Sequence, residues 1–454
     1  MTRDVRVGSW ARRPERNRTA VDEAWPAPRR NVPFLLTMPA YGGTLAAARC
    51  LGRRGIPVTM AGDGALVPAR WSRHVTRWLR CPPIGKLDRF LDWLLAFGER
   101  EPGHVLYPTS DDLAWLIADR ARELGKVYRL YQPGVDAVLR LLDKKALYEA
   151  CARVGVDTVP TDFPVGVEQA LSAARDLGFP ILLKPRTQVL SATRAKGRFV
   201  ERADELAECY AGFLAYNRYG AALSRVLPNA DLPMVQVFRP QANDGIYSIA
   251  GFIGRGTEDV AARASRKILQ RPRRLGVGVC YEEAPVDAAA LAGVVRLCRA
   301  VGYFGVFEAE YVPEAGRLQL IDFNPRFYGQ MGFEIARDMP LAYMSWLGAL
   351  GEEEALARTL SDVRDWPEGR GYAYCHGFVL GLTLLVQRLS GRMSAAESRR
   401  WRRWRKDHQR NALLIDAADW PGDRRPGAAA AAAEIHFALR HPRAFMRNVA
   451  LGVN

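Results

Sequence analysis

The chain has 454 residues, and its 65 Lys and Arg against 49 Asp and Glu give a formal net charge of +16. Apolar residues make up 48% and charged residues 25%, which is typical of a folded globular protein and excludes wholesale disorder. The excess of basic over acidic residues favours an anionic partner, such as nucleic acid, a membrane surface or a phosphorylated small molecule. No run of roughly 20 apolar residues occurs, so no membrane span is expected.

The first part of the chain has the pattern of a basic arm followed by a parallel α/β domain. Residues 1–31 are rich in Arg and Pro and lack apolar periodicity, so a flexible arm is expected. The elements expected next are a buried strand over residues 32–38, a glycine turn at Gly42-Gly43, a helix over residues 44–51 and a strand over residues 57–61. This order predicts an α/β domain within residues 32–130. The glycines do not form GxGxxG, so the dinucleotide-binding motif is absent.

A strand expected over residues 104–108 is followed by polar residues and then by a helix expected over residues 113–124. The carboxyl ends of parallel strands are where ligands bind in open α/β sheets, which favours a ligand contact by Ser110 or Asp111. Either residue would equally serve as the N-cap of the helix. The sequence leaves both roles open.

The middle of the chain alternates helices and strands. The expected helices cover residues 136–154, 167–177 and 288–301, and the expected strands cover residues 180–184, 198–200, 234–238, 247–253, 305–311 and 318–323. The last two strands are expected to pair around a turn at residues 314–316. A polar, basic connection occupies residues 187–197.

The composition changes after about residue 350, and residues 351–454 are expected to form a basic, mostly helical extension. From residue 391 to the end there are 13 Lys and Arg against 6 Asp and Glu. The basic patch over residues 399–406 contains Trp401 and Trp404, which suits binding to nucleic acid or anionic lipid. The alternative is a solvated helix face with both Trp packed on the core. The apolar run over residues 377–386 is too short to span a membrane and predicts a buried helix.

The strongest chemical signal is a pair of strands that carry acidic residues. Side chains alternate along a strand, so Asp322 and Asn324 share a face, and so do Glu308 and Glu310. Pairing of the two strands would bring a carboxylate from each strand and an amide oxygen to one point, which suits Mg²⁺. Arg326 follows, within reach of a phosphate or carboxylate. The alternative is a solvent-facing polar hairpin.

Several cations lie at the edges of expected strands and helices. Lys184 ends an apolar strand, where a phosphate partner would explain it. Lys144 begins a helical segment, and Arg266-Lys267 interrupt an apolar stretch. Each alone is ordinarily a solvated surface cation, but beside a candidate Mg²⁺ site they favour phosphate binding.

Taken in order, these segments resemble the ATP-grasp superfamily over about residues 32–350. The matching segments are Asp143-Lys144, Val159-Pro160, residues 179–184, 234–238, 265–267 and 276–278, Glu310-Tyr311 and residues 322–326. Tyr247-Ser248 and residues 266–270 are similar to the bacterial carboxylate–amine ligase branch, which includes D-aspartate ligase-like proteins and shares the ATP-binding fold of the carbamoyl-phosphate synthase large subunit. The resemblance implies a Rossmann-like pre-ATP-grasp domain before a two-subdomain ATP-grasp fold over residues 131–350, with a lid subdomain over about 155–235.

The resemblance also implies a role for each site residue. Phosphates would be contacted by Lys144 and Lys184, adenine by Gln236, Val237, Phe238 and Arg239, and ribose by Asp244. Mg²⁺, or Mn²⁺ in its place, would be held by Glu310, Asp322 and Asn324. The γ-phosphate and an acyl phosphate would be steadied by Arg266, Lys267 and Arg326. Residues 187–197 would form a mobile lid, which departs from the family in having Gly197 as its single glycine. Val237 stands where many relatives have an acid.

The implied activity is that of an ATP- and Mg²⁺-dependent carboxylate–amine ligase, which joins a small-molecule carboxylate to an amine through an acyl phosphate. No protein nucleophile is required, and no Ser/His/Asp or Cys/His arrangement stands out among the six His. One alternative is an ATP-grasp kinase or carboxylase-like enzyme that stops at a phosphorylated product. Another is a basic protein that binds nucleic acid or a membrane surface.

The cysteines indicate the compartment. The chain has seven, at positions 50, 81, 151, 209, 280, 298 and 375, with neither CxxC spacing nor the density of a disulfide framework. Buried free thiols in a reducing, cytoplasmic location are therefore expected. The C-terminal extension is expected to pack on the catalytic body or to support a homodimer.

Overall fold

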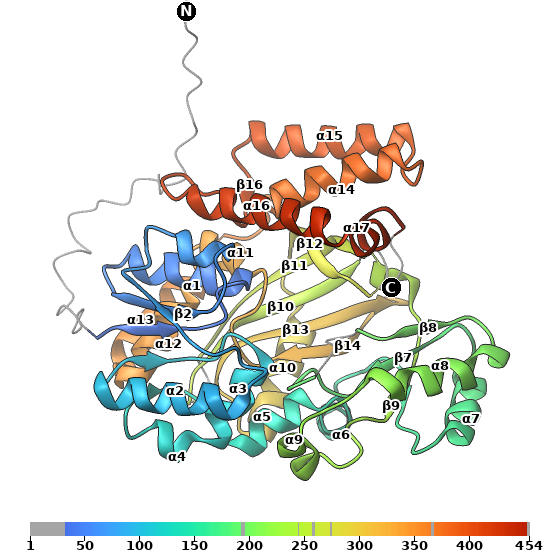
Figure 1. Cartoon of the computed structure of the whole chain (residues 1–454), viewed down its shortest axis with the longest axis horizontal. Coiled ribbons are helices and arrows are strands. Elements are labelled where there is room, and N and C mark those ends of the chain that lie inside the picture. The colour runs from blue at the N-terminus through green and yellow to red at the C-terminus, as the bar shows by residue number, and fades with distance from the viewer. Residues whose placement is uncertain are drawn as a thin grey trace, which may run out of the picture.

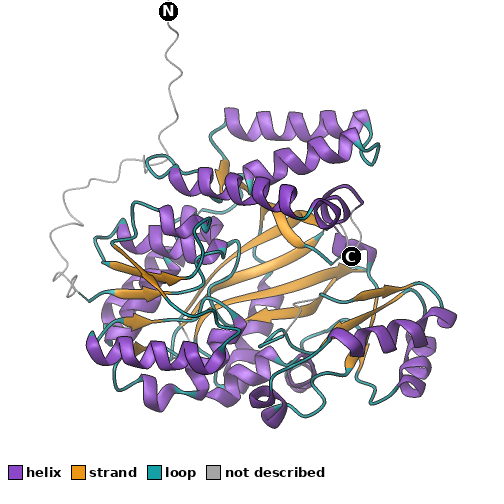
Figure 2. Ribbon diagram, in the orientation of Figure 1, coloured by secondary structure: helices purple, strands orange, loops and turns teal. Residues whose placement is uncertain are grey.

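The computed structural model describes residues 32–191, 196–243, 245–256, 259–272, 275–364 and 367–451 (Figure 1). The basic arm expected over residues 1–31 lies outside these ranges. Within them the chain forms three β-sheets with helices packed on their faces (Figure 2). The expected combination of α/β and α+β architecture is therefore confirmed.

The N-terminal sheet is parallel throughout, in the strand order β3-β2-β1-β4-β5. Its strands are β1 (Phe34–Leu36), β2 (Val58–Gly62), β3 (Arg77–Arg80), β4 (Val105–Leu106) and β5 (Arg129–Leu130). Its helices are α1 (Gly42–Gly52), α2 (Leu87–Arg100), α3 (Asp111–Asp119) and α4 (Ala121–Leu124), with a 3₁₀ turn η1 (Pro68–Trp71). The parallel α/β domain is as expected, although the helix predicted over residues 113–124 is divided at Arg120.

The central sheet has the order β14-β13-β10-β11-β12-β15-β16 and runs through the middle of the molecule (Figure 2). Its strands are β10 (Ile246–Ile253), β11 (Val260–Arg271), β12 (Val277–Ala284), β13 (Gly305–Glu314), β14 (Arg317–Asn324), β15 (Ala373–Cys375) and β16 (Leu414–Asp416). One face is packed by α5 (Val135–Leu142), α6 (Lys144–Arg153) and α10 (Ala288–Val301). Strands β15 and β16 come from the C-terminal extension, so this extension completes the sheet.

The helix predicted over residues 136–154 is broken at Asp143, which separates α5 from α6. The carboxylate of Asp143 accepts hydrogen bonds from Arg186, at 3.0 Å from Nε and 2.7 Å from Nη2. The backbone N–H of Lys144 donates to the carbonyl of Arg186. These contacts hold Asp143 in an extended conformation, so a tertiary ion pair overrides the local helical pattern.

The third sheet has the order β6-β9-β7-β8 and lies beside the central sheet (Figure 1). Its strands are β6 (Thr161–Asp162), β7 (Ile181–Pro185), β8 (Arg198–Val200) and β9 (Pro233–Val237), and its helices are α7 (Val167–Leu177), α8 (Ala203–Tyr216) and α9 (Ala221–Val226). Side chains of α7 and α8 pack on it around the buried Phe213. The sheet falls within the segment in which the lid subdomain is expected.

The C-terminal part is mostly helical. Its helices are α11 (Met331–Ala336), α12 (Leu341–Leu350), α13 (Glu353–Arg364), α14 (Gly377–Leu389), α15 (Ala395–Arg410), α16 (Arg425–Arg440), α17 (Pro442–Met446) and the terminal turn η3 (Arg447–Leu451). Helix α14 was predicted to be buried, but only one of its faces is. No helix in the described ranges combines the length and the apolar character needed to cross a membrane.

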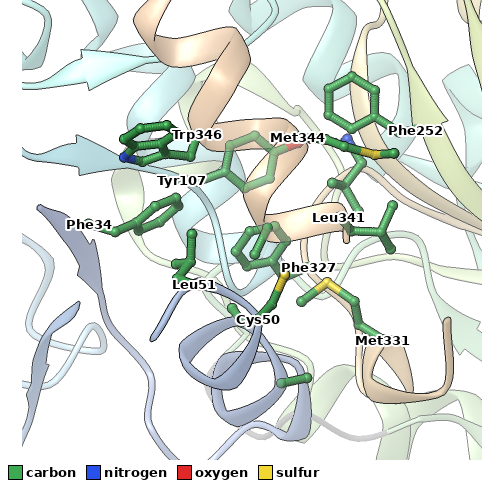
Figure 3. Packing of buried hydrophobic residues seen from close by; sticks show 14 of the residues in the cluster. Phe34, Cys50, Leu51, Tyr107, Phe252, Phe327, Met331, Leu341, Met344 and Trp346 are labelled. Carbon is green, nitrogen blue, oxygen red and sulfur yellow. Dashed lines mark hydrogen bonds between the residues drawn. The ribbon is translucent and has the colours of Figure 1, made fainter. Parts of the chain in front are cut away.

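The main core joins the N-terminal domain to the central sheet (Figure 3). Phe34 of β1 stacks on Phe327, which follows β14, with ring centroids 6.3 Å apart. Tyr107, which follows β4, lies 4.7 Å from the same ring. Trp346 of α12 is fully buried in this cluster. The two domains therefore share one apolar core, which fixes how the N-terminal domain sits over the central sheet.

A buried ion pair fastens the C-terminal extension to the N-terminal domain. Arg49 of α1 donates to the carboxylate of Asp423 at 2.8 Å and to the carbonyl of Ala417 at 3.1 Å. Asp423 also accepts from Ser72 Oγ at 2.8 Å and from the backbone N–H of Arg73 at 2.9 Å. Burial alone would raise the pKa of Asp423, but these hydrogen bonds hold it below its usual value.

We expect Asp423→Asn to lower the free energy of unfolding by about 3–5 kcal/mol, because it leaves the buried guanidinium of Arg49 without its charge partner. The difference from wild type should be present above the unfolded pKa of Asp, about 3.9, and should shrink as the pH falls through the lower folded pKa. Urea unfolding at pH 7 and at pH 3 measures both effects.

The control is Asp419→Asn, since Asp419 lies in the same loop but is exposed. It should change the free energy of unfolding by less than about 0.5 kcal/mol. Equal losses in the two variants would contradict the proposed importance of the Arg49–Asp423 pair.

Candidate functional site

A cavity lies between the third sheet and the central sheet. Its walls include Leu182 of β7, Gln236 of β9, Lys267 of β11, Glu310 of β13 and Asp322 of β14. Its empty volume, including solvent at the mouth, is about 870 Å³. This is within the range of roughly 300–1,000 Å³ that is typical of small-molecule sites.

Part of the cavity wall is charged. The charged residues are Lys144, Lys184, Lys196, Arg239, Lys267, Glu310 and Asp322. Lys144 Nζ lies 2.5 Å from Asp322 Oδ1, and Lys267 Nζ lies 3.5 Å from Glu310 Oε1. Burial favours neutral Asp322, but Lys144 outweighs this and keeps the pKa of its carboxyl below the usual value. Four ammonium groups face two carboxylates, so the wall has an excess of positive charge for an anionic ligand.

Lys184 is half-buried at the end of β7. Burial, together with the nearby charge of Lys144, lowers the pKa of Lys184 to about 8. Its Nζ donates to Gln236 Oε1 at 3.2 Å, and this acceptor is neutral. An anion bound beside Lys184 would stabilise its charged form, which makes this position suited to phosphate.

The side chain of Gln236 is held on both sides. Its Nε2 donates to Tyr148 Oη at 3.0 Å and to Thr161 Oγ1 at 2.9 Å, while its Oε1 accepts from Lys184. The resemblance implied that Gln236 meets adenine largely through its backbone. The structure places Gln236 in the cavity wall, and its side chain orients Lys184.

The rest of the wall is largely apolar. Leu182, Val237, Phe238 and Leu275 contribute to it, and Phe238 is braced by the edge of Phe199 with ring centroids 4.9 Å apart. Arg239, also predicted to meet adenine, lines the cavity and pairs with Glu314 at 3.4 Å. An apolar wall beside a cationic one suits a ligand that has a flat base and an anionic tail.

The predicted metal ligands lie on one face of the central sheet, but they do not converge on one point. The register of β13 and β14 sets Glu310 opposite Asp322, and Glu308 opposite Asn324. Asn324 Nδ2 donates to Glu308 Oε2 at 3.0 Å, and its Oδ1 accepts from Arg326 at 2.7 Å. Asn324 is not among the residues that line the cavity.

The donor set still fits Mg²⁺ in its chemistry, because it offers two opposed carboxylates and an amide oxygen. Within the described ranges, no cluster of three or more His, Cys, Asp or Glu is arranged to hold a metal ion. A Mg²⁺ ion here would therefore need Asn324 or phosphate oxygens in addition to Glu310 and Asp322.

Arg326 ties the central sheet to the N-terminal domain, and it is not among the residues that line the cavity. Its Nε lies 2.5 Å from Asp111 Oδ1 at the start of α3. Ser110 caps the same helix by accepting from the backbone N–H of Leu113 at 3.3 Å. Ser110 is therefore the N-cap and Asp111 is the partner of Arg326, while a ligand contact by either residue stays a prediction.

A buried carboxyl lies next to this pair. Burial, followed by the charges of Glu310 and Glu334, raises the pKa of Glu308 to about 8. The side-chain amides of Gln330 and Asn324 both donate to Glu308.

Arg266 does not reach the cavity, contrary to the sequence prediction. Lys267 points into the cavity, and successive side chains on a strand point to opposite faces. Arg266 is 57% exposed and pairs with Glu282 on the neighbouring strand at 3.4 Å. Strand alternation alone separates these two cations.

The predicted lid is described in part. Gln188 and Lys196 line the cavity, while residues 192–195 lie outside the described ranges. The backbone N–H of Leu190 donates to the buried Asp112 of α3 at 2.7 Å, which anchors one end. Gly197 has a φ of +140°, and a Cβ there would lie 2.6 Å from the carbonyl oxygen of Leu183. The single glycine is therefore required where the segment returns to β8.

Sequence reasoning gave no individual role to Lys196 and no protein partner to Asp111. Lys196 is one of two cations in the predicted lid, which were expected to offer cationic contacts as a group. Asp111 was considered as a cap or ligand contact, but its pairing with Arg326, 215 residues away, has no local signal.

Comparison with known proteins gives the fold. No protein-family model matches the chain. Biotin carboxylase of Pseudomonas aeruginosa is 28% identical over 222 residues, which is 46% of this chain and 45% of that protein. The match therefore spans less than half the length of this curated relative.

Two solved structures resemble the chain over 70% of its length. The biotin carboxylase–β-γ-ATP complex from Campylobacter jejuni has a TM-score of 0.54 and 15% identity, with 71% of that chain covered. N5-carboxyaminoimidazole ribonucleotide synthetase from Thermus thermophilus has a TM-score of 0.51 and 18% identity, with 78% covered. These likenesses confirm the ATP-grasp fold that the sequence predicted.

We expect polyphosphate binding to weaken as Lys184 loses its proton. The affinity for inorganic tripolyphosphate should fall by up to about tenfold per pH unit above pH 8, because the charged form favours the anion. Isothermal titration calorimetry between pH 7 and pH 9.5 measures this.

The matched control is Lys184→Arg, which keeps its charge over this range because the guanidinium pKa exceeds about 12. Tripolyphosphate also titrates, and its contribution is common to both proteins. Parallel pH profiles for wild type and Lys184→Arg would refute the assignment of this titration to Lys184.

Proposed function

We propose that this chain is an ATP-grasp ligase that joins a small-molecule carboxylate to an amine. The observation that carries the proposal is the cavity, in which four lysines and two opposed carboxylates share a wall with Leu182, Val237 and Phe238. ATP combines the same two chemistries, an apolar base and a run of anionic phosphates. The product would be an amide or peptide-like bond, with ADP and phosphate released.

The proposed roles follow the wall of the cavity. Lys144 and Lys184 would bind the phosphates, and Lys267, beside Glu310, would meet the terminal one. Adenine would lie against Val237 and Phe238, near the backbone of residues 236–239. Asp244, to which the sequence assigned the ribose, lies outside the described ranges, so its role stays a prediction.

Glu310 and Asp322 would hold Mg²⁺, or Mn²⁺ in its place, with Asn324 as a further donor. When bound, this ion supplies positive charge that offsets the phosphate oxygens during transfer. Each carboxylate is paired with a lysine. Release of Lys144 and Lys267 from these pairs would expose both carboxylates and turn both ammonium groups toward the phosphates.

The chemistry needs positioning and charge rather than a protein nucleophile. A carboxylate is a poor electrophile, so one of its oxygens would first accept the γ-phosphoryl group, with cleavage of the bond to the β-phosphate. The amine nitrogen would then attack the acyl carbon, and phosphate would leave. Arg326, which follows β14 four residues after Asp322, would offset charge on the carboxylate and on the mixed anhydride if its pair with Asp111 opened.

The relatives favour a second candidate. Biotin carboxylase and N5-carboxyaminoimidazole ribonucleotide synthetase both have carboxylation in their names. A carboxylase-like reaction, in which bicarbonate replaces the organic carboxylate or a phosphorylated product is released, is therefore the alternative.

A cytoplasmic location belongs to the same proposal. All seven cysteines are free, as expected for a reducing compartment. The homodimer expected from the sequence stays a prediction, which light scattering would check.

Phosphorus NMR with Mg²⁺ and ATP tests the function. For a ligase, we expect ADP and phosphate to form only when pooled carboxylic acids and pooled amines are both present. Turnover with bicarbonate alone would move the carboxylase to first place. Glu310→Ala and Asp322→Ala should abolish turnover. The ligase proposal fails if ATP neither binds nor turns over in the presence of Mg²⁺.

Substitution of the two cations at positions 266 and 267 tests which of them faces the cavity. Lys267→Met should lower kcat/KM by about 100-fold or more, because it removes a charge beside the transferred phosphate. Arg266→Met should stay within about threefold of wild type, because Arg266 lies on the other face of β11. A comparable loss in Arg266→Met would show that the face assignment is wrong.

A further inference from the structure

Exposed apolar side chains are concentrated on the C-terminal helices. Among the described residues, six of the eleven large apolar side chains that are exposed lie between positions 377 and 446. They belong to α14, α16 and α17, which gather at one end of the molecule with α15 (Figure 1). The candidate site uses none of them.

Helix α14 carries one apolar stripe on its outer face. Phe378, Leu382, Leu385 and Leu389 follow each other at spacings of four and three residues, which places them on one side of a helix. Leu389 is 78% exposed. The opposite side is buried, and there Gln387 donates to the carbonyl of Val449 at 3.1 Å.

Helix α16 repeats the arrangement. Ala428, Ala432, Ile435 and Leu439 have the same spacing, and Leu439 is 79% exposed. On another side of this helix Glu434 forms two short contacts with Arg271 of β11, at 2.5 and 3.1 Å. The apolar stripe therefore points away from the contact with the central sheet.

Arginines lie at the C-terminal ends of both stripes. Arg388 precedes Leu389, and Arg440 and Arg443 follow Leu439; all three are exposed. Helix α15 adds seven Lys and Arg against two acidic residues, and its Arg405 lies beside Gly381 of α14. The combination of large aliphatic side chains with flanking arginines is that of a surface-lying amphipathic helix.

Two other occupants fit less well. Nucleic acid would need aromatic rings to stack on its bases, but Trp401 is only 6% exposed and Trp404 Nε1 donates to Glu282 at 2.7 Å. A second copy in a symmetric dimer would bring its own arginines against these, and like charges repel. An anionic lipid surface accepts the aliphatic and the cationic groups together.

We propose that the outer faces of α14 and α16, with the arginines of α15 and α17, dock this chain onto an anionic membrane surface. The leucines and Ile435 would enter the boundary between headgroups and acyl chains, and the arginines would contact lipid phosphates. This inference does not depend on the proposed ligase activity.

Flotation of the full chain with vesicles tests the proposal. Vesicles of phosphatidylcholine with 30% phosphatidylglycerol should bind the chain at least tenfold more tightly than phosphatidylcholine alone, and binding should fall steeply between 50 and 500 mM salt. The double variant Leu389→Ser/Leu439→Ser should lose at least tenfold in vesicle affinity, because two exposed aliphatic anchors are removed.

The matched control is Val165→Ser/Val226→Ser, since both valines are exposed but lie outside the C-terminal helices. Tripolyphosphate affinity and thermal unfolding should be unchanged in both double variants, which separates loss of docking from loss of the fold. No preference for anionic vesicles, or equal losses in the two double variants, would overturn the proposal. So would a dimer that dissociates in Leu389→Ser/Leu439→Ser, or RNA binding that this variant loses.

Discussion

The candidate site depends on the register in which β13 pairs with β14. This register sets Glu310 directly opposite Asp322 on the face of the sheet that borders the cavity. A slip by one residue would turn a carboxylate toward the helices that pack behind the sheet. Two features oppose a slip. Gly316 supplies the positive φ that the turn needs, and Phe307 and Phe323 stack on each other in the core behind the sheet.

The lysines that face these carboxylates compensate their buried negative charge. Buried charges are costly unless they are paired, and Lys144 and Lys267 pair with Asp322 and Glu310. Lys184 has a neutral hydrogen-bond partner and keeps a lowered pKa. A polyphosphate ligand with its metal ion would satisfy all of these groups at once, because it supplies anions for the lysines and a cation for the carboxylates. Charge balance in the cavity therefore favours the two ligands binding together.

The sequence predicted those elements whose ends are marked by capping or turn residues. Helix α10 was predicted at its observed bounds because Asp287 caps its start and Gly302 ends it in a left-handed conformation. Strands β15 and β16 were not predicted, because they are defined by pairing between β12 and distant segments of the C-terminal extension. In the site, the opposed carboxylates followed from strand alternation.

The bonds of Asn324 could not be predicted, because they depend on the tertiary position of Arg326. Strand alternation would have separated Arg266 from Lys267, but the family resemblance grouped the two. Local rules therefore located the site, while its detailed pairing required the packing of distant segments.

The C-terminal extension packs on the rest of the molecule rather than forming an appendage. Asp423 binds Arg49 in the N-terminal domain, and Glu434 binds Arg271, which directly follows Gln270 in the wall of the cavity. Helix α16 is thus connected to the edge of the cavity on one side and exposes its apolar stripe on another. Any shift of α16 that docking on a surface favours must act on Arg271 as well. Suppose that docking changes the affinity of the cavity for its ligand by some factor. By thermodynamic reciprocity, the bound ligand then changes the affinity of α16 for the surface by the same factor.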